Sequence, residues 1–154
     1  MSSIPPDYDP MKPRIYIDKE GSWFQDGVPI LHRRTYLQNN KNLGQDEEGR
    51  YFVDEGRGRV YAVVEDTPFV VKMVTESDGK LVMVLNDETE EELDFKTLEL
   101  SEENVPYSPV KGGKFEARFT RPAYYELAKL LIEEGGEFYI EFGGEKHRVK
   151  RRKG

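Results

Sequence analysis

Turns centred on glycine divide this chain into short segments and constrain its fold more than any other feature. Asp26-Gly27 and Asp78-Gly79 are typical of two-residue β-hairpins, because both central residues of a type I′ turn have positive φ. Between the turns, apolar and polar residues alternate, which is the pattern of half-buried strands. Further strand pairs are expected around Gly56–Gly58, Gly112-Gly113 and Gly143-Gly144. The chain is therefore expected to consist mostly of antiparallel strands.

Two segments interrupt this alternation and predict helices. The first runs from Arg34 to about Asn42 and is weakened by its asparagines, which are poor helix formers. The second is predicted over Arg121–Glu134, with Thr120 as its N-cap and Gly135-Gly136 as its end. Two helices among many strands predict the α+β class.

A weak internal repeat relates the two helical regions at a constant separation of 87 positions, from Arg34 to Arg121 and from Val53 to Ile140. Each copy has the pattern β-α-β-β, although two generic units of that kind would look similar. We expect a disordered lead-in at 1–12, one domain over 13–150 and a basic tail at 151–154. Inside the domain, the first repeat covers about 13–65, a strand-rich middle about 66–104 and the second repeat about 105–150.

The composition fits one domain, or two small fused ones, in 154 residues. Hydrophobic residues are only 36%, but aromatic residues are 12%, and each buried ring removes about 150–250 Å² from water. The overall composition, together with the lack of an apolar stretch of about 20 residues, excludes disordered, coiled-coil, collagen and membrane proteins. The chain has no cysteine, so disulfides, thiolate zinc sites and thiol nucleophiles are excluded. We expect a cytoplasmic protein without membrane association.

The net charge of −7 argues against a general affinity for nucleic acid. Between Asp87 and Glu103 there are nine carboxylates and one cation, whereas from Lys146 onward there are six cations and no carboxylate. These patches are interpreted as a solvated loop and a frayed tail, or as surfaces that face each other. The basic tail lacks an aromatic residue for base stacking, so we expect no specific nucleic-acid partner.

The sequence offers little catalytic or metal chemistry. His32 and His147 are the only histidines and have no second ligand at zinc spacing, so we expect no metal. The acidic run Asp87–Glu92 lacks the glycine of a calcium loop and is expected to form a hydrated turn. Nucleophile motifs, phosphate loops and dinucleotide-binding glycine patterns are absent, so no cofactor is expected.

Cations at the predicted helix starts are the main functional candidates. Arg33 and Arg34 precede or open the first helix and Arg121 opens the second, although the positive end of a helix dipole disfavours cations. One interpretation is that neighbouring carboxylates neutralise these arginines, or that the arginine side chains extend away from the helix over a strand. The other is that the free backbone N–H groups and the arginines together bind an anion. Arg57 in the adjacent turn, together with Arg59, would join such a site.

The leading hypothesis is a non-enzymatic binding or regulatory module for an anionic small molecule or an acidic segment, with contacts from Arg33, Arg34, Arg57 and Arg121. One alternative is a protein–protein adaptor that uses strand edges. A less favoured alternative is a hydrolase with Asp66 and His32. Trp23-Phe24 could stack on a ligand, but burial of Trp23 over the sheet is favoured.

Several segments resemble uncharacterised families. The runs Ile17–Phe24 and Val64–Val70, with Gly27, Pro29 and Ile30, resemble the bacterial DUF1285 family, which has a repeated α/β motif. The segment Asn104–Tyr107, with Gly112-Gly113 and Tyr125–Leu127, resembles a related uncharacterised family shared by bacteria and eukaryotes. Together the likeness spans about residues 13–149. It implies an α+β fold with internal repetition, and for the first family ligand sensing or signalling, but supplies no catalytic residue or ligand.

Overall fold

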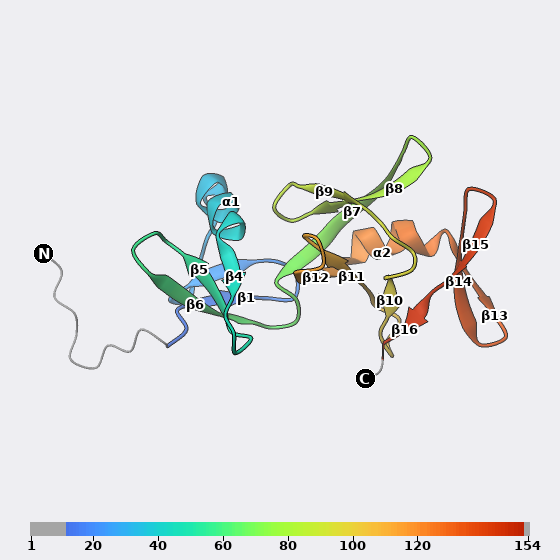
Figure 1. Ribbon diagram of the computed structural model, residues 1–154. Helices are drawn as coiled ribbons and strands as arrows, with labels where there is room; N and C mark the ends of the chain where they lie inside the picture. Colours follow the sequence, from blue (N-terminus) through green and yellow to red (C-terminus); the bar gives the residue numbers. More distant parts are fainter. Residues whose placement is uncertain (1–11, 153–154) are drawn as a thin grey trace, which may run out of the picture. The chain divides into compact units, whose positions relative to one another are not determined.

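The computed structural model describes residues 12–152, which form two compact units, one ending at Glu65 and the other beginning at Asp66 (Figure 1). The predicted domain over 13–150 spans both units. The predicted lead-in lies outside the described residues except for Lys12. No helix within residues 12–152 is long and apolar enough to cross a membrane. The α+β class is confirmed, with parallel as well as antiparallel strand pairs.

The first unit is a six-stranded sheet with the order β3-β2-β1-β6-β5-β4. All neighbouring strands are antiparallel except β1 and β6, which are parallel. Its elements are β1 Ile15–Ile17, β2 Trp23–Gln25, β3 Val28–Pro29, α1 Arg33–Lys41, β4 Leu43–Gln45, β5 Tyr51–Asp54 and β6 Arg59–Val64. The Asp26-Gly27 hairpin is confirmed, since both residues have positive φ, 50° and 81°.

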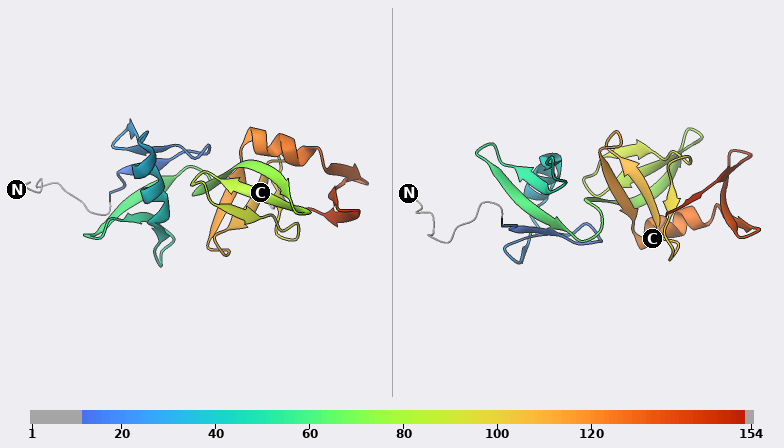
Figure 2. Two further views of the ribbon diagram at one scale, coloured as in Figure 1. Left: turned by 90° about the horizontal axis from the view of Figure 1, so that it is seen from above. Right: turned by 60° about the horizontal axis from the view of Figure 1, so that its bottom comes forward.

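Helix α1 lies across one face of this sheet (Figures 1 and 2). Alternation in β1 buries Ile15 and Ile17 and leaves Tyr16 exposed, which follows from the period of two in a strand. Trp23 is buried as expected, with its ring edge toward Tyr36 at a centroid distance of 6.2 Å. The Tyr36 hydroxyl donates a 2.6 Å hydrogen bond to the Gly21 carbonyl, which ties the helix to the β1–β2 turn.

The second unit contains a seven-stranded sheet, β16-β10-β11-β12-β7-β8-β9, and a three-stranded sheet, β13-β14-β15. Helix α2 packs against β7 and β12 (Figure 2). The elements are β7 Phe69–Ser77, β8 Lys80–Leu85, β9 Glu90–Glu92, β10 Glu99–Leu100, β11 Pro106–Val110, β12 Phe115–Phe119, α2 Arg121–Ala128, β13 Leu131–Glu134, β14 Glu137–Phe142, β15 Glu145–Arg148 and β16 Lys150–Arg151. Ala123 and Leu127 of α2 are fully buried.

Two predicted boundaries in this unit are wrong, and one predicted turn is only partly correct. Helix α2 ends at Ala128 rather than Glu134, because Leu131–Glu134 pairs with β14 as strand β13. Gly135-Gly136 consequently forms the turn of a hairpin. The acidic run contributes strand β9, Glu90–Glu92, which pairs with β8. Arg151 belongs to strand β16 rather than to a tail, because Lys150–Arg151 pairs with β10. For Arg151 a strand distant in sequence determines the local structure, whereas β13 and β9 each pair with a strand next to them along the chain.

The pairing registers of the two units correspond around the first hairpin. In the first unit Tyr16 pairs with Phe24, and in the second Glu99 pairs with Tyr107, so both numbers rise by 83. The parallel partner corresponds as well, because Tyr16 pairs with Val63 of β6 and Glu99 with Lys150 of β16.

The correspondence continues through the second hairpin. Asp54 pairs with Arg59 and Glu141 with Lys146, so both numbers rise by 87. The Asp54 N–H donates a 3.0 Å hydrogen bond to the Asn42 carbonyl, and the Glu141 N–H donates one of 3.0 Å to the Leu130 carbonyl. In the second unit, the segment that corresponds to the first unit begins at β10. Strands β7–β9 precede it, so they have no counterpart in the first unit.

Candidate functional site

The four arginines predicted to bind an anion are not brought together within either unit. Arg33 and Arg34 lie in the first turn of α1, whose N-cap is His32. Arg57 lies in the β5–β6 turn, and its neighbour Gly56 lines a cavity with residues from the other end of α1. The nine residues of α1 span about 13 Å at ~1.5 Å per residue, so Arg57 and the first turn are at opposite ends of the helix. Arg121 begins α2 in the second unit.

The start of α1 is partly capped by the chain itself. The His32 ring accepts a hydrogen bond from the Thr35 N–H at 3.4 Å, which uses one of the free amides that an anion would need. Among residues 12–152, no carboxylate is paired with Arg34, Arg57 or Arg121. Arg34 at the start of α1 and Arg121 at the start of α2 therefore keep a charge that no carboxylate in the described residues neutralises, but they lie in different units.

Asp66, the carboxylate of the hydrolase alternative, belongs to a polar network in the second unit. Its Oδ2 accepts a 2.6 Å hydrogen bond from the Tyr107 hydroxyl and one of 2.8 Å from Arg118 Nη1. Burial and this hydrogen bond to Asp66 raise the pKa of Tyr107. His32 lies in the other unit. Across the described range, 12–152, no three His, Asp or Glu side chains are arranged to hold a metal ion.

A cavity of about 770 Å³ in the second unit, here called the basic cavity, gathers charges that are distant in sequence. It lies beside β10 and β16, which are neighbours in Figure 1, and beside β14 and β15. Its lining side chains and backbone come from Lys96, Glu99, Gly136, Glu137, Phe138, Arg148, Val149, Lys150 and Arg151.

The carboxylates of the basic cavity are already paired. Glu137 accepts a 2.7 Å hydrogen bond from Arg148, and Glu99 lies 3.4 Å from Arg152, which is outside the lining. Since Arg152 also pairs with Glu116 and β10 pairs with β16, the acidic and basic patches of the sequence do meet within the chain. Because both carboxylates of the lining are paired with arginines, the lining cations that have no carboxylate partner determine the net charge of the cavity.

Three cations of the basic cavity have no carboxylate partner within residues 12–152: Lys96, Lys150 and Arg151. Arg151 is held by neutral groups, since its Nη1 donates to Asn104 Oδ1 at 2.9 Å and to the Ser101 carbonyl at 3.3 Å. Its guanidinium also lies over the Phe138 ring, 4.9 Å from the centroid. The cavity therefore combines uncompensated positive charge with an aromatic wall, an arrangement suited to an anion with an apolar part.

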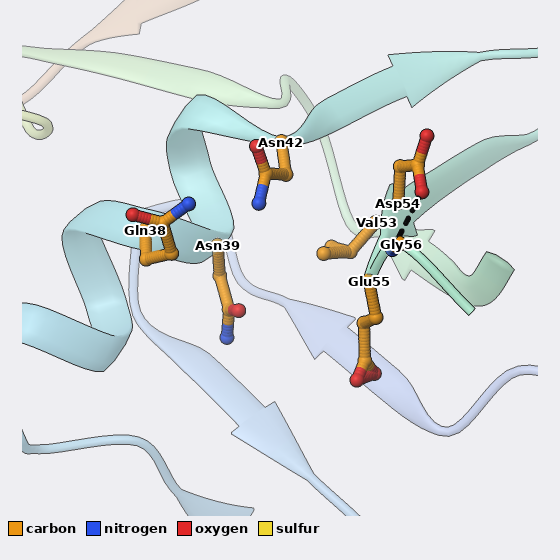
Figure 3. A pocket seen from close by; sticks show the side chains of 7 residues that line it. All are labelled: Gln38, Asn39, Asn42, Val53, Asp54, Glu55 and Gly56. Carbon is orange, nitrogen blue, oxygen red and sulfur yellow. Dashed lines mark hydrogen bonds between the residues drawn. The ribbon is translucent and has the colours of Figure 1, made fainter. Parts of the chain in front are cut away.

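The first unit has a cavity of different chemistry, here called the amide cavity. It measures about 580 Å³ and lies between the last turn of α1 and the β5–β6 turn (Figure 3). It is lined by Gln38, Asn39, Asn42, Val53, Asp54, Glu55 and Gly56. No lysine or arginine is among these residues.

Sequence reasoning missed Lys96 and Lys150 of the basic cavity. They come together because β10 and β16 pair in parallel, a contact that no local pattern indicates. The available signal is the group of cations from Lys146 onward, which the sequence presents either as a frayed tail or as a surface that faces the acidic patch.

Comparison with solved structures identifies the fold. The crystal structure of a DUF1285 family protein from Silicibacter pomeroyi DSS-3 matches with a TM-score of 0.69 and 22% identity, covering 90% of this chain and 80% of that one. A DUF1285 family protein from Shewanella baltica OS155 matches with a TM-score of 0.64 and 19% identity, covering 76% of this chain and 91% of that one. No protein-family model and no curated protein matches the chain. The resemblance to DUF1285 proteins that the sequence indicates is thus confirmed at the level of the fold.

Proposed function

We propose that this chain, which has the fold of DUF1285 family proteins, is a binding module whose second unit takes an anionic small molecule or acidic segment in the basic cavity. The observation that carries the proposal is the group of three cations without carboxylate partners, Lys96, Lys150 and Arg151, around one aromatic wall.

The geometry of Arg151 supports an anionic ligand. Hydrogen bonds to Asn104 and Ser101 hold the guanidinium in place, so little side-chain entropy is lost when it binds a carboxylate or phosphate. Lys96 and Lys150 supply flexible point charges beside it. A volume of about 770 Å³ lies in the range of small-molecule sites.

The arginines singled out from the sequence remain a prediction. The basic cavity is favoured over Arg33, Arg34, Arg57 and Arg121 because its cations converge on one concavity within a single unit. The hydrolase alternative is disfavoured because the Asp66 carboxylate is paired with Arg118.

The adaptor alternative, in which a partner strand joins a sheet edge, has weaker support. The outer strands of the seven-stranded sheet, β9 and β16, have three and two residues. Their sequences are Glu-Glu-Glu and Lys-Arg, and short charged edges oppose strand addition.

We also propose that the two units are copies of one segment. The matching registers at separations of 83 and 87 residues support this, as do the equivalent hydrogen bonds to Asn42 and Leu130. On this proposal β7–β9 is an insertion that extends the second copy. The copies would then begin at β1 and β10, which differs from the β-α-β-β unit expected from the sequence.

Isothermal titration with inorganic phosphate and with citrate tests the anion site. We expect both to bind, and Lys150→Ala to weaken binding at least tenfold because it removes a charge at the cavity. Lys114→Ala is the matched control, since Lys114 is an exposed lysine of the same unit outside the lining. Equal effects of the two variants, or no binding by the unmodified protein, would contradict the proposal. A loss confined to Arg34→Ala would favour the arginines predicted from the sequence.

A further inference from the structure

The amide cavity of the first unit has side chains that the fold itself does not use. Asn39 and Asn42 line it, and neither side chain makes a hydrogen bond with any residue from 12 to 152. Asn40, between them, is different: it is 2% exposed and its Nδ2 donates a 2.8 Å hydrogen bond to the Tyr36 carbonyl. Asparagine disfavours a helix relative to alanine, so Asn39 is not explained by helix stability.

Figure 3 shows how these groups are arranged. Asn39 and Asn42 project from the end of α1 on the side of the β5–β6 hairpin, and the Val53 side chain extends toward them from β5. Glu55 projects from the turn next to Val53, and Asp54 is fixed by the hydrogen bond from the Gly56 N–H to its Oδ1 at 2.9 Å. The cavity thus has amide groups on the side of α1 and the Glu55 carboxylate on the side of the β5–β6 turn, with the largely buried Val53 between them, while the Asp54 carboxylate is turned away from the amides.

The electrostatics of the amide cavity favour a cation. The C-terminal end of a helix carries partial negative charge, and this cavity lies at the C-terminal end of α1. Glu55 adds a carboxylate to the lining, which itself contains no lysine or arginine; Lys41 and Arg57 are next to lining residues in the sequence but do not line the cavity. Amide and carboxylate oxygens are also the acceptors that an ammonium group requires for its three N–H donors.

The second unit has apolar, half-buried side chains at two of the corresponding positions. Leu130 occupies the position of Asn42, because each carbonyl accepts the equivalent hydrogen bond from β14 or β5. Phe142 occupies the position of Glu55, and its ring lies 6.0 Å from that of Phe95. The two units therefore differ here in the polarity of equivalent side chains, and those of the first unit line a cavity.

We propose that the first unit binds a small organic ammonium ion in the amide cavity. The ammonium group donates to the Glu55 carboxylate and to the side-chain oxygens of Asn39 and Asn42. This site is independent of the anionic ligand proposed for the second unit, and the two sites take ligands of opposite charge.

Titration with putrescine, compared with 1,4-butanediol, tests this inference on the full chain. The diol has the same carbon chain but no charge, so we expect binding of putrescine at least tenfold tighter than that of the diol. In ¹⁵N-resolved NMR spectra, putrescine should shift the side-chain amide signals of Asn39 and Asn42. No binding of putrescine, equal binding of the diol, or shifts located elsewhere would overturn the proposal.

A charge-neutralising variant adds a second test. Glu55→Gln should weaken putrescine binding at least tenfold, whereas Glu47→Gln should leave it within twofold. Glu47 is an exposed carboxylate of the same unit that does not line the cavity, so both variants change the net charge equally. Both positions are exposed, and unchanged circular dichroism confirms folding. Equal losses in the two variants would overturn the proposal.

Discussion

The two units share a scheme of strand pairing but place opposite chemistry on it. At one set of equivalent positions, Tyr16 and Val63 give the first unit an exposed apolar pair, whereas Glu99 and Lys150 give the second unit charges at the basic cavity. At another set, the first unit has the amide cavity and the second unit has Leu130 and Phe142. Each unit thus has a cavity at positions where the other unit has apolar side chains.

The two units also differ in one strand, which is continuous in the first unit and interrupted in the second. In the first unit, β6 runs without interruption from Arg59 to Val64. In the second unit the corresponding residues divide at Val149 into β15 and β16, and the basic cavity lies along that break. The comparison teaches that pairing registers specify the scaffold, while side chains at a few equivalent positions determine where a cavity forms.

Exchanging equivalent helix residues should give the largest effect. Leu127 is fully buried, and Asn39 has the corresponding position in α1, since both are the seventh residue of their helix. Leu127→Asn should lower the free energy of unfolding by about 3–5 kcal/mol, because it removes apolar burial and introduces an unpaired amide. Asn39→Leu should change it by less than about 1 kcal/mol. Urea denaturation measures both, and similar losses would contradict the difference between the units.

A smaller effect is expected at Gly44. A Cβ atom there would lie 2.7 Å from Cζ of Phe52, whose ring also carries the guanidinium of Arg59 over it, 4.0 Å from the ring centroid. Gly44→Ala should therefore cost about 1–3 kcal/mol of unfolding free energy through overpacking. The corresponding position in the second unit is Ile132, where Ile132→Ala should relieve nothing and lose apolar contact. A neutral Gly44→Ala variant in thermal denaturation would show that this close approach is not required.

The smallest effect concerns the β7–β9 segment, which only the second unit contains. Lys111 Nζ donates to Asp87 Oδ2 at 2.6 Å, which joins the β8–β9 turn to the β11–β12 turn. Burial opposes ionisation of Asp87, but hydrogen bonds from Lys111 and Thr89 outweigh it and lower the pKa from its ordinary value of 3.8. Asp87→Asn should cost about 1 kcal/mol at neutral pH, allowing for solvent screening.

The pH dependence of that effect follows from the direction of the pKa shift. A carboxylate with a depressed pKa in the folded state stabilises it above the unfolded pKa, and this contribution is lost as pH falls through the folded value. The difference between the unmodified protein and Asp87→Asn should therefore be constant from pH 5 to 7 and vanish in strong acid. A difference that is independent of pH down to strong acid would exclude this ion pair as its cause.

Local chemistry made the turns and helix starts predictable. Asp78-Gly79 has the positive φ values, 51° and 75°, that its sequence indicates, and α1 begins one residue before the predicted start. The end of α2 was not predictable in this way, because Leu131–Glu134 continues a plausible helical pattern and becomes a strand only by pairing with β14. Lys96 and Lys150, by contrast, come together through a pairing between strands distant in sequence, β10 and β16, so the basic cavity could not be derived from spacing.

One NMR titration of the full, uniformly ¹⁵N-labelled protein tests the central claim that the two units bind ligands of opposite charge. Phosphate should shift backbone signals of residues 96–101, 136–138 and 148–151, and putrescine should shift those of residues 38–42 and 53–56. Overlapping sets of shifted residues, or phosphate shifts centred on Arg33, Arg34, Arg57 and Arg121, would contradict it.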